Sequence, residues 1–247
     1  MERHVFIRAC FFSEGDVFEK KADGDTDRIS SMCISSLKGL AQSRSAALPK
    51  DAPLFFGSAF SSLADLHAFN CVCENNGALA VNPRLFPRAV LNAPSCRAGI
   101  EMHITEPVYN IMSGEASEFY ALKLAAAFVS CGNAENAIIC TAEECCRIAA
   151  EVVGGPFTDR CGAIWLTASP TDWELHSVRS RPPDTEKTAP GMLTGELTRR
   201  ICGLINAEQQ GCAGRDVPEI AGSEAVYTAE LIKRKPKAST FDNTSNI

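Results

Sequence analysis

The sequence predicts an α/β fold in which a mostly parallel, five-stranded sheet lies between helices. Residues 53–57 form a wholly apolar run that ends in glycine, which is typical of a strand buried on both faces of a parallel sheet. Between such runs, residues 25–41 and 115–129 repeat apolar side chains at helical spacing. Strands that alternate with helices in this way indicate one layered α/β domain.

The individual elements follow from the same two patterns. Apolar runs rich in β-forming residues predict five strands, and apolar side chains at helical spacing predict five helices, one of which, over 61–70, should turn Leu63, Leu66 and Phe69 inward. Three prolines make residues 82–94 a shaped loop rather than a long helix. The strands are expected at 5–12, 53–57, 108–111, 137–140 and 163–168, and the helices at 25–41, 61–70, 96–104, 115–129 and 143–153.

The C-terminal third departs from this alternation. We expect the main domain to span residues 1–175 and a charged, proline-containing surface loop to span 176–192. Residues 193–232 should add a helix, near 195–208, and a strand, near 225–232, and the polar residues 233–247 should form a flexible tail.

Composition excludes several classes of function. The chain has 24 Lys and Arg against 30 Asp and Glu, a net charge of −6, and its basic residues are scattered, which argues against nucleic-acid binding. No apolar run approaches the roughly 20 residues of a membrane span, and the first residues do not resemble a signal peptide, so we expect a cytoplasmic protein. The twelve cysteines include no C-x-x-C pair, and no histidine stands at ligand spacing from a cysteine pair. They are therefore expected to be small buried side chains, with no metal site and no cofactor.

Four segments, in order and at matching spacing, resemble the N-terminal half of a β-ketoacyl synthase, a condensing enzyme of the thiolase-fold superfamily. The segment 106–117 resembles the family's nucleophile elbow, and 82–94 resembles its proline loop. The likeness covers about residues 5–169 and implies a single thiolase-like half-domain. The four segments are 56–63, 82–94, 106–117 and 137–144.

Two departures from the family bear on catalysis. A gapless alignment of residues 83–117 places Glu115 at the position of the family's cysteine nucleophile, and a carboxylate cannot form the acyl thioester. The family's two catalytic histidines lie in a C-terminal half for which this sequence has no counterpart. None of the four histidines, His4, His67, His103 and His176, stands in a matching loop.

The resemblance therefore implies a chain-length-factor-like subunit that pairs with an active ketosynthase in fatty acid or polyketide-type pathways such as aryl polyene biosynthesis. Acyl carrier protein would reach it only through that partner. By position, Phe60 resembles the residue that gates the acyl tunnel, and Leu85 and Phe86 resemble residues that reach across the dimer. Plain core packing is an equal alternative for these three. The expected dimer-interface strand comprises Val108, Tyr109, Asn110 and Ile111.

Two other functions remain open from the sequence. The chain could be a stand-alone acyltransferase or condensing enzyme that uses Glu115 as a general base, or Cys96 or Cys140 as a nucleophile. It could also be a homodimer that binds small acyl ligands. The sequence specifies neither the acyl chain length nor the product.

Overall fold

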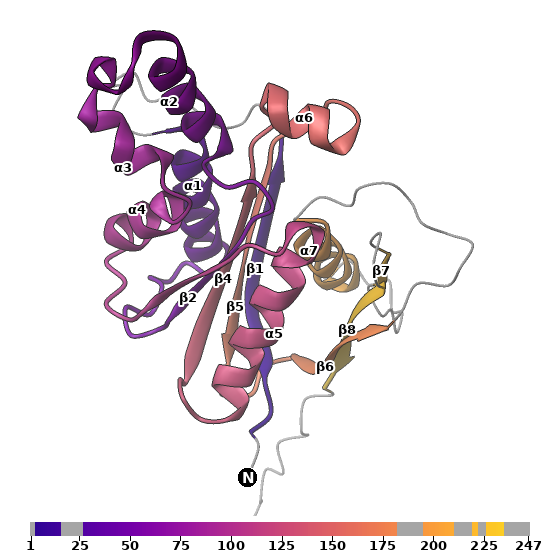
Figure 1. The fold of residues 1–247 in the computed structure, drawn as a ribbon. Coiled ribbons are helices and arrows are strands. Elements are labelled where there is room, and N and C mark those ends of the chain that lie inside the picture. The colour runs from indigo at the N-terminus through magenta and orange to yellow at the C-terminus, as the bar shows by residue number, and fades with distance from the viewer. Residues whose placement is uncertain (1–2, 16–26, 182–194, 210–218, 222–225, 235–247) are drawn as a thin grey trace, which may run out of the picture.

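The structure is a computed structural model that describes residues 3–15, 27–181, 195–209, 219–221 and 226–234. Their strands form one eight-stranded mixed sheet. The strand order is β3-β2-β4-β5-β1-β6-β8-β7 (Figure 1). An α/β fold is therefore confirmed. The strands are β1 (Phe6–Glu14), β2 (Leu54–Gly57), β3 (Val108–Ile111), β4 (Asn136–Glu143), β5 (Arg160–Thr167), β6 (Trp173–Arg181), β7 (Glu219–Ala221) and β8 (Val226–Lys233).

Helices cover both faces of the sheet. Helices α1 and α4 lie on one face, and α5 and α7 lie side by side on the other (Figure 1). None of the helices in the described ranges is both long and apolar enough to cross a lipid bilayer. The α-helices are α1 (Arg28–Ser43), α2 (Leu63–Asn76), α3 (Phe86–Ala89), α4 (Ala93–Glu101), α5 (Ser117–Ser130), α6 (Arg147–Val153) and α7 (Glu196–Gln209), with 3₁₀ turns at Ala78–Ala80, Pro83–Leu85 and Gly114–Ala116.

Strand β2 is buried on both faces, as its apolar sequence predicts. Leu54 and Phe56 pack into the core beneath α1, whereas Phe55 points into the core beneath α5. Helix α1 begins at Arg28, three residues after the predicted start, because Asp27 caps it, its carboxylate accepting a hydrogen bond of 2.7 Å from the backbone N–H of Ser30. Strand β2 thus has an apolar core on each face of the sheet.

The prediction of five mostly parallel strands is wrong in number and in direction. Only β2 pairs in parallel, with β3 on one side and β4 on the other, and the remaining pairs are antiparallel. A strand buried on both faces shows the same apolar run whichever way its neighbour runs, so the pattern could not specify the direction of β5.

The predicted surface loop over 176–192 is also wrong at its start. Residues 176–181 form the second half of β6, which pairs with β8 about fifty residues later in the chain. The sequence did not predict this strand because several of its side chains are polar and exposed, and its pairing partner β8 lies far along the chain. Residues 182–192 lie outside the described residues. The predicted extension contains α7 and β8, and Lys233 ends β8 rather than beginning a tail, of which 235–247 lie outside the described residues.

Two helix predictions need correction. No residue of α2 is fully buried, so Leu63, Leu66 and Phe69 do not form an inward face. This helix packs against the short helix α3 and α6 rather than on the sheet. The helix predicted over 143–153 begins only at Arg147, because Glu143 completes strand β4.

A buried carboxylate joins the start of α5 to the start of α7. Glu118 is 4 % exposed and accepts hydrogen bonds from the backbone N–H groups of Gly195 (2.8 Å), Leu197 (3.0 Å) and Thr198 (2.7 Å), and from the Thr198 hydroxyl (2.5 Å). Burial raises the pKa of this carboxyl, and the bonds from Thr198, Gly195 and Leu197 oppose the shift. The side chain thus satisfies N–H groups that the first turn of α7 leaves unpaired.

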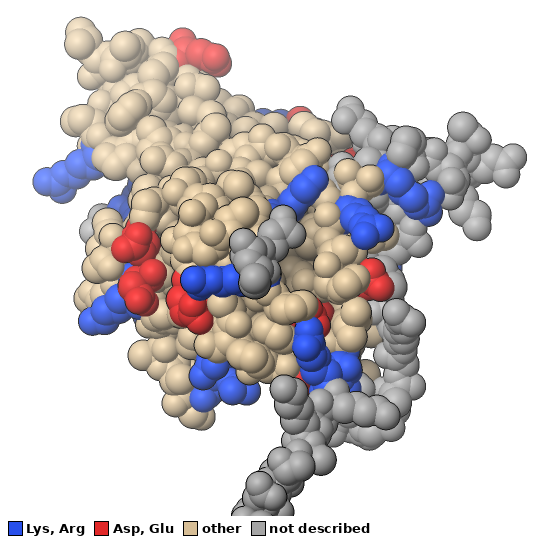
Figure 2. Space-filling model, turned by 90° about the horizontal axis from the view of Figure 1, so that it is seen from below, with Lys and Arg blue, Asp and Glu red and all other residues tan. Residues whose placement is uncertain are grey.

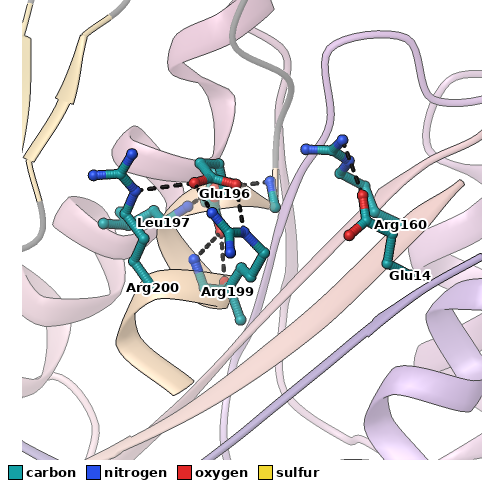
Figure 3. A network of polar contacts seen from close by, with 9 residues as sticks. Glu14, Arg160, Glu196, Leu197, Arg199 and Arg200 are labelled. Atoms are coloured by element: carbon teal, nitrogen blue, oxygen red, sulfur yellow. Dashed lines mark hydrogen bonds and ion pairs between the residues drawn. The ribbon is translucent and has the colours of Figure 1, made fainter. Parts of the chain in front are cut away.

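Ion pairs on the outer side of α7 reinforce the same turn. Glu196 accepts from Nε of Arg199 at 2.7 Å and from Nε of Arg200 at 2.9 Å (Figure 3). Close by, Arg160 on β5 forms an ion pair of 3.2 Å with Glu14 on β1. The arginines of α7 are about half exposed, so each pair contributes at most about 1 kcal/mol. Of the polar contacts that attach α7, those of Glu118 therefore contribute most.

Replacing Glu118 should destabilise the fold strongly. The change Glu118→Ala leaves several buried N–H groups without an acceptor, and we expect the free energy of unfolding to fall by about 3 kcal/mol. Urea denaturation monitored by circular dichroism measures this. The control Glu101→Ala removes an exposed carboxylate paired with Lys38 and should cost less than about 1 kcal/mol. Equal losses in both variants would contradict the role of Glu118.

Candidate functional site: the turn between β3 and α5

The turn that carries Glu115 connects strand β3 to helix α5. Gly114 adopts a φ of +54°, and Gly114–Ala116 form one 3₁₀ turn before the helix begins at Ser117. The Ser117 hydroxyl donates to the Gly114 carbonyl at 2.7 Å and accepts from the Ser113 N–H at 2.8 Å. These two bonds hold the turn closed. The structure thus places half-buried Glu115 between strand and helix, where the alignment expects the nucleophile.

The loop that follows β2, residues 58–62, is named the gate loop after the predicted role of Phe60, and a buried glutamate holds it. Glu143, at the end of β4, is fully buried, and its carboxylate accepts from the N–H groups of Ala59 and, at 3.3 Å, Phe60. Phe60 is half-buried and its ring stacks on Phe157 with the centroids 6.3 Å apart. The sequence analysis missed Glu143, although an acidic residue that ends an apolar strand was a signal for it. The structure therefore provides a defined position for the predicted gate residue.

The other two predicted tunnel residues lie in the proline-rich segment. Leu85 is half-buried at the end of a 3₁₀ turn, whereas Phe86 is 58 % exposed and contacts Phe69 with a ring separation of 6.0 Å. Core packing is thus excluded for Phe86. This segment is tied to the gate loop because the Ser61 hydroxyl donates to the Leu91 carbonyl at 2.7 Å.

Strand β3 lies at the edge of the described sheet. It pairs with β2 alone, and an aromatic cluster supports it from behind, where Tyr109 packs on Phe55 and Phe128 at 4.9 and 5.3 Å between ring centroids. Seven of the eight large apolar side chains that are exposed in the described ranges lie between residues 79 and 124, and those of α4, α5 and residue 112 lie in segments that contact or directly follow β3. They are Leu79, Phe86, Leu91, Ile100, Met112, Tyr120 and Leu124.

The fold is shared with solved condensing-enzyme structures. One, "The ishigamide ketosynthase/chain length factor", matches with a TM-score of 0.72 at 16% identity, over 86% of this chain and 82% of the other. A ketosynthase in complex with its chain length factor from Xenorhabdus doucetiae matches at 0.60 and 13% identity, over 81% and 76%. A type II polyketide acyl-carrier protein in complex with its ketosynthase matches at 0.62 and 12%, over 74% and 70%. No family model matches, and neither does any curated protein.

The chain has the ketosynthase fold. The predicted thiolase-like fold is thereby confirmed, since these matches cover 86% and 81% of this chain.

The candidate cysteine nucleophiles of this ketosynthase-fold chain are poorly placed for acyl transfer. Cys140 is fully buried in β4, with its Sγ 3.3 Å from the Ser36 hydroxyl. Cys96, in α4, is half-buried and has an Asn92 amide 3.7 Å from its sulfur. The expectation that the cysteines are small buried side chains holds for only four of the eleven in the described ranges, Cys33, Cys140, Cys161 and Cys202, and Cys131 is exposed. Burial raises the pKa of Cys33 and Cys161, which disfavours their thiolate forms. All cysteines in the described ranges are free, and no metal-binding cluster is found there.

The four histidines lie either at the surface or on helix α2. His4, His103 and His176 are exposed. His67 lies on α2 with its Nε2 3.3 Å from the Cys71 sulfur, a contact between residues four apart on a helix. This pair was not predicted, although its spacing was visible in the sequence.

An acidic depression lies beside the gate loop of the ketosynthase fold. It has a volume of about 580 Å³ and is lined in part by Glu144, Asp159 and Phe157, the residue on which Phe60 stacks. Asp159 accepts from Arg28 at 2.5 Å and from the Cys145 N–H at 2.7 Å. Burial, with the nearby charges of Asp159 and Asp65, raises the pKa of Glu144 to about 7.

Glu144 should make stability depend on pH. Its folded pKa of about 7 lies above the ordinary value of 4.5, so its contribution to stability is greatest below pH 4.5 and is lost as the pH rises through 7. Glutamine cannot ionise, so we expect the melting temperature of Glu144→Gln, relative to wild type, to rise between pH 5 and pH 8. The control Glu151→Gln removes an exposed carboxylate of α6 and should show no such trend. A difference for Glu144→Gln that stays constant with pH would contradict this prediction.

Proposed function

We propose that this chain is a non-catalytic, chain-length-factor-like subunit that pairs with an active β-ketoacyl synthase in the cytoplasm and shapes its acyl tunnel. The pathway would be of the fatty acid or polyketide type, as in aryl polyene biosynthesis. The observation that carries the proposal is Glu115, a carboxylate in the turn where a ketosynthase fold needs a thiol. Two of the similar structures are described as a ketosynthase with its chain length factor.

The chemistry of Glu115 supports a subunit without its own condensation activity. Acyl transfer requires a nucleophile whose acyl adduct survives until condensation, and a thiolate at a helix start provides it. A carboxylate would give an anhydride, which water hydrolyses. The alternative, a stand-alone enzyme that uses Cys96 or Cys140, is disfavoured by the complete burial of Cys140 and by the absence of an imidazole contact at Cys96 among the described residues.

The edge strand β3 supports association through this face. An unpaired strand edge exposes backbone N–H and C=O groups, and a second strand that adds to it satisfies them. The exposed apolar side chains next to β3, Met112 after the strand and Tyr120 and Leu124 on α5, would be covered at the same time. We infer that residues Val108 to Ile111 form the centre of the interface with the ketosynthase, and that acyl carrier protein acts through that partner.

The gate loop is the part of the chain that would set acyl length. Glu143 fixes the backbone of Phe60, and Phe157 supports its ring, so the aromatic side chain can present a rigid obstacle. Leu85 and exposed Phe86, in the segment that Ser61 ties to this loop, would reach the partner's tunnel.

A charge placed beside β3 should weaken the complex. We expect Met112→Glu to reduce affinity for the co-expressed ketosynthase by at least about tenfold, since the charge would be buried at the interface. Co-purification followed by analytical ultracentrifugation measures this. The matched control is Val152→Glu, which alters an exposed apolar residue of α6 away from β3 and should leave affinity unchanged. Failure of the wild-type chain to associate with a ketosynthase encoded beside it would contradict the proposal.

We expect Phe60 to limit the length of the acyl product and Glu115 to have little effect on the condensation rate. In the reconstituted complex, Phe60→Ala opens the gate, so mass spectrometry should show longer acyl products. Glu115→Ala should keep the rate within about threefold, because Glu115 is not a nucleophile. Acyl-thioester or carbon–carbon bond formation by the purified chain without any companion would overturn the proposed function.

A further inference from the structure

A small basic cavity lies where strand β6 joins the edge of β1. The two strands pair at only two positions, Phe6 with Glu174 and Ile7 with Trp173. At the next residue the register of β1 against β5 shifts, so that Arg8 occupies a bulge. On this side no described strand pairs with β1 beyond Ile7, and a cavity of about 140 Å³ opens there.

The walls of this cavity come from five parts of the chain, and three of their four charged side chains are basic. Arg8 of β1, Arg44 at the end of α1 and Lys233 of β8 line it, against a single carboxylate, Asp172. Trp173 and Ile205 complete an apolar part of the wall. The face of the molecule seen from below carries Lys and Arg side chains interspersed with groups of Asp and Glu (Figure 2). The cavity thus offers three cations against one anion.

Two of these cations lack a counter-charge in the part of the chain that the structure describes. Arg8 is half-buried, and its guanidinium carbon lies 5.2 Å from the centre of the Trp165 ring. Neither Arg8 nor Arg44 forms an ion pair with a carboxylate of the described residues. A partly desolvated guanidinium held over an aromatic face gains strongly from a bound oxyanion, because its N–H groups can bind two oxygens at once.

We propose that this cavity binds a phosphate group, either as inorganic phosphate or as a small phosphate monoester. Its volume accommodates a phosphate with a few further atoms, and two arginines with a lysine match a dianion better than a single carboxylate. The site is separate from the turn of Glu115 and from the β3 edge, and it does not rest on the proposed function.

The chain carries its own reporter for this site. It contains two tryptophans, of which Trp173 lines the cavity and Trp165 lies beneath Arg8. We expect tryptophan fluorescence of the purified full chain to change saturably with sodium phosphate at constant ionic strength. A parallel titration with glycerol 3-phosphate distinguishes the sources: tighter binding of the ester assigns the site to a monoester, and equal or weaker binding assigns it to free phosphate.

Variants test the residues of the site. Arg44→Gln alters an exposed side chain and should weaken phosphate binding by at least about tenfold without affecting the fold. Arg8→Gln should abolish binding. The control Lys38→Gln, which removes an exposed lysine paired with Glu101 on the same helix α1, should bind as wild type does. No saturable change up to about 50 mM phosphate, wild-type affinity in Arg44→Gln, or equally tight binding of acetate would each overturn the proposal.

Discussion

The close approach of strand β2 to the start of helix α5 is the constraint on which the candidate site depends. A β-carbon on Gly57, the last residue of β2, would lie 2.8 Å from the carbonyl oxygen of Ser117. Only glycine permits this contact without displacement of the backbone. The loop that carries Phe60 therefore leaves the sheet directly beside the turn that carries Glu115.

The same constraint determines how α7 is attached. Because the start of α5 lies against β2, Glu118 is fully enclosed, and its carboxylate faces the first turn of α7. Gly162 of β5 leaves the space that Thr198 occupies, since a β-carbon there would lie 2.7 Å from the methyl group of Thr198. Helix α7 thus covers the sheet beside α5 through one buried acid and one small residue, rather than through a large apolar face alone.

Four glutamates near the carboxyl ends of these strands illustrate how environment assigns roles. Glu115 lies in the turn between β3 and α5, and Glu118 closes a helix start. Glu143 holds two backbone N–H groups of the gate loop. Glu144 faces other acids in a half-buried depression, which raises its pKa to about 7. The side chain is the same in each case, and hydrogen-bond donors, burial and neighbouring charge make the difference.

The sequence by itself determined the layered α/β class, strand β2, helices α1 and α5, and the acid in the turn before α5. Each of these depends on local apolar spacing, capping, or one residue in a motif, all of which are properties of neighbouring residues. Only the tertiary structure decided the antiparallel course of β5, the pairing of β6 with β8, and the partners of Glu118 and Glu143. These features join residues 17 to 84 positions apart, and no local pattern records which distant segment satisfies a given hydrogen bond.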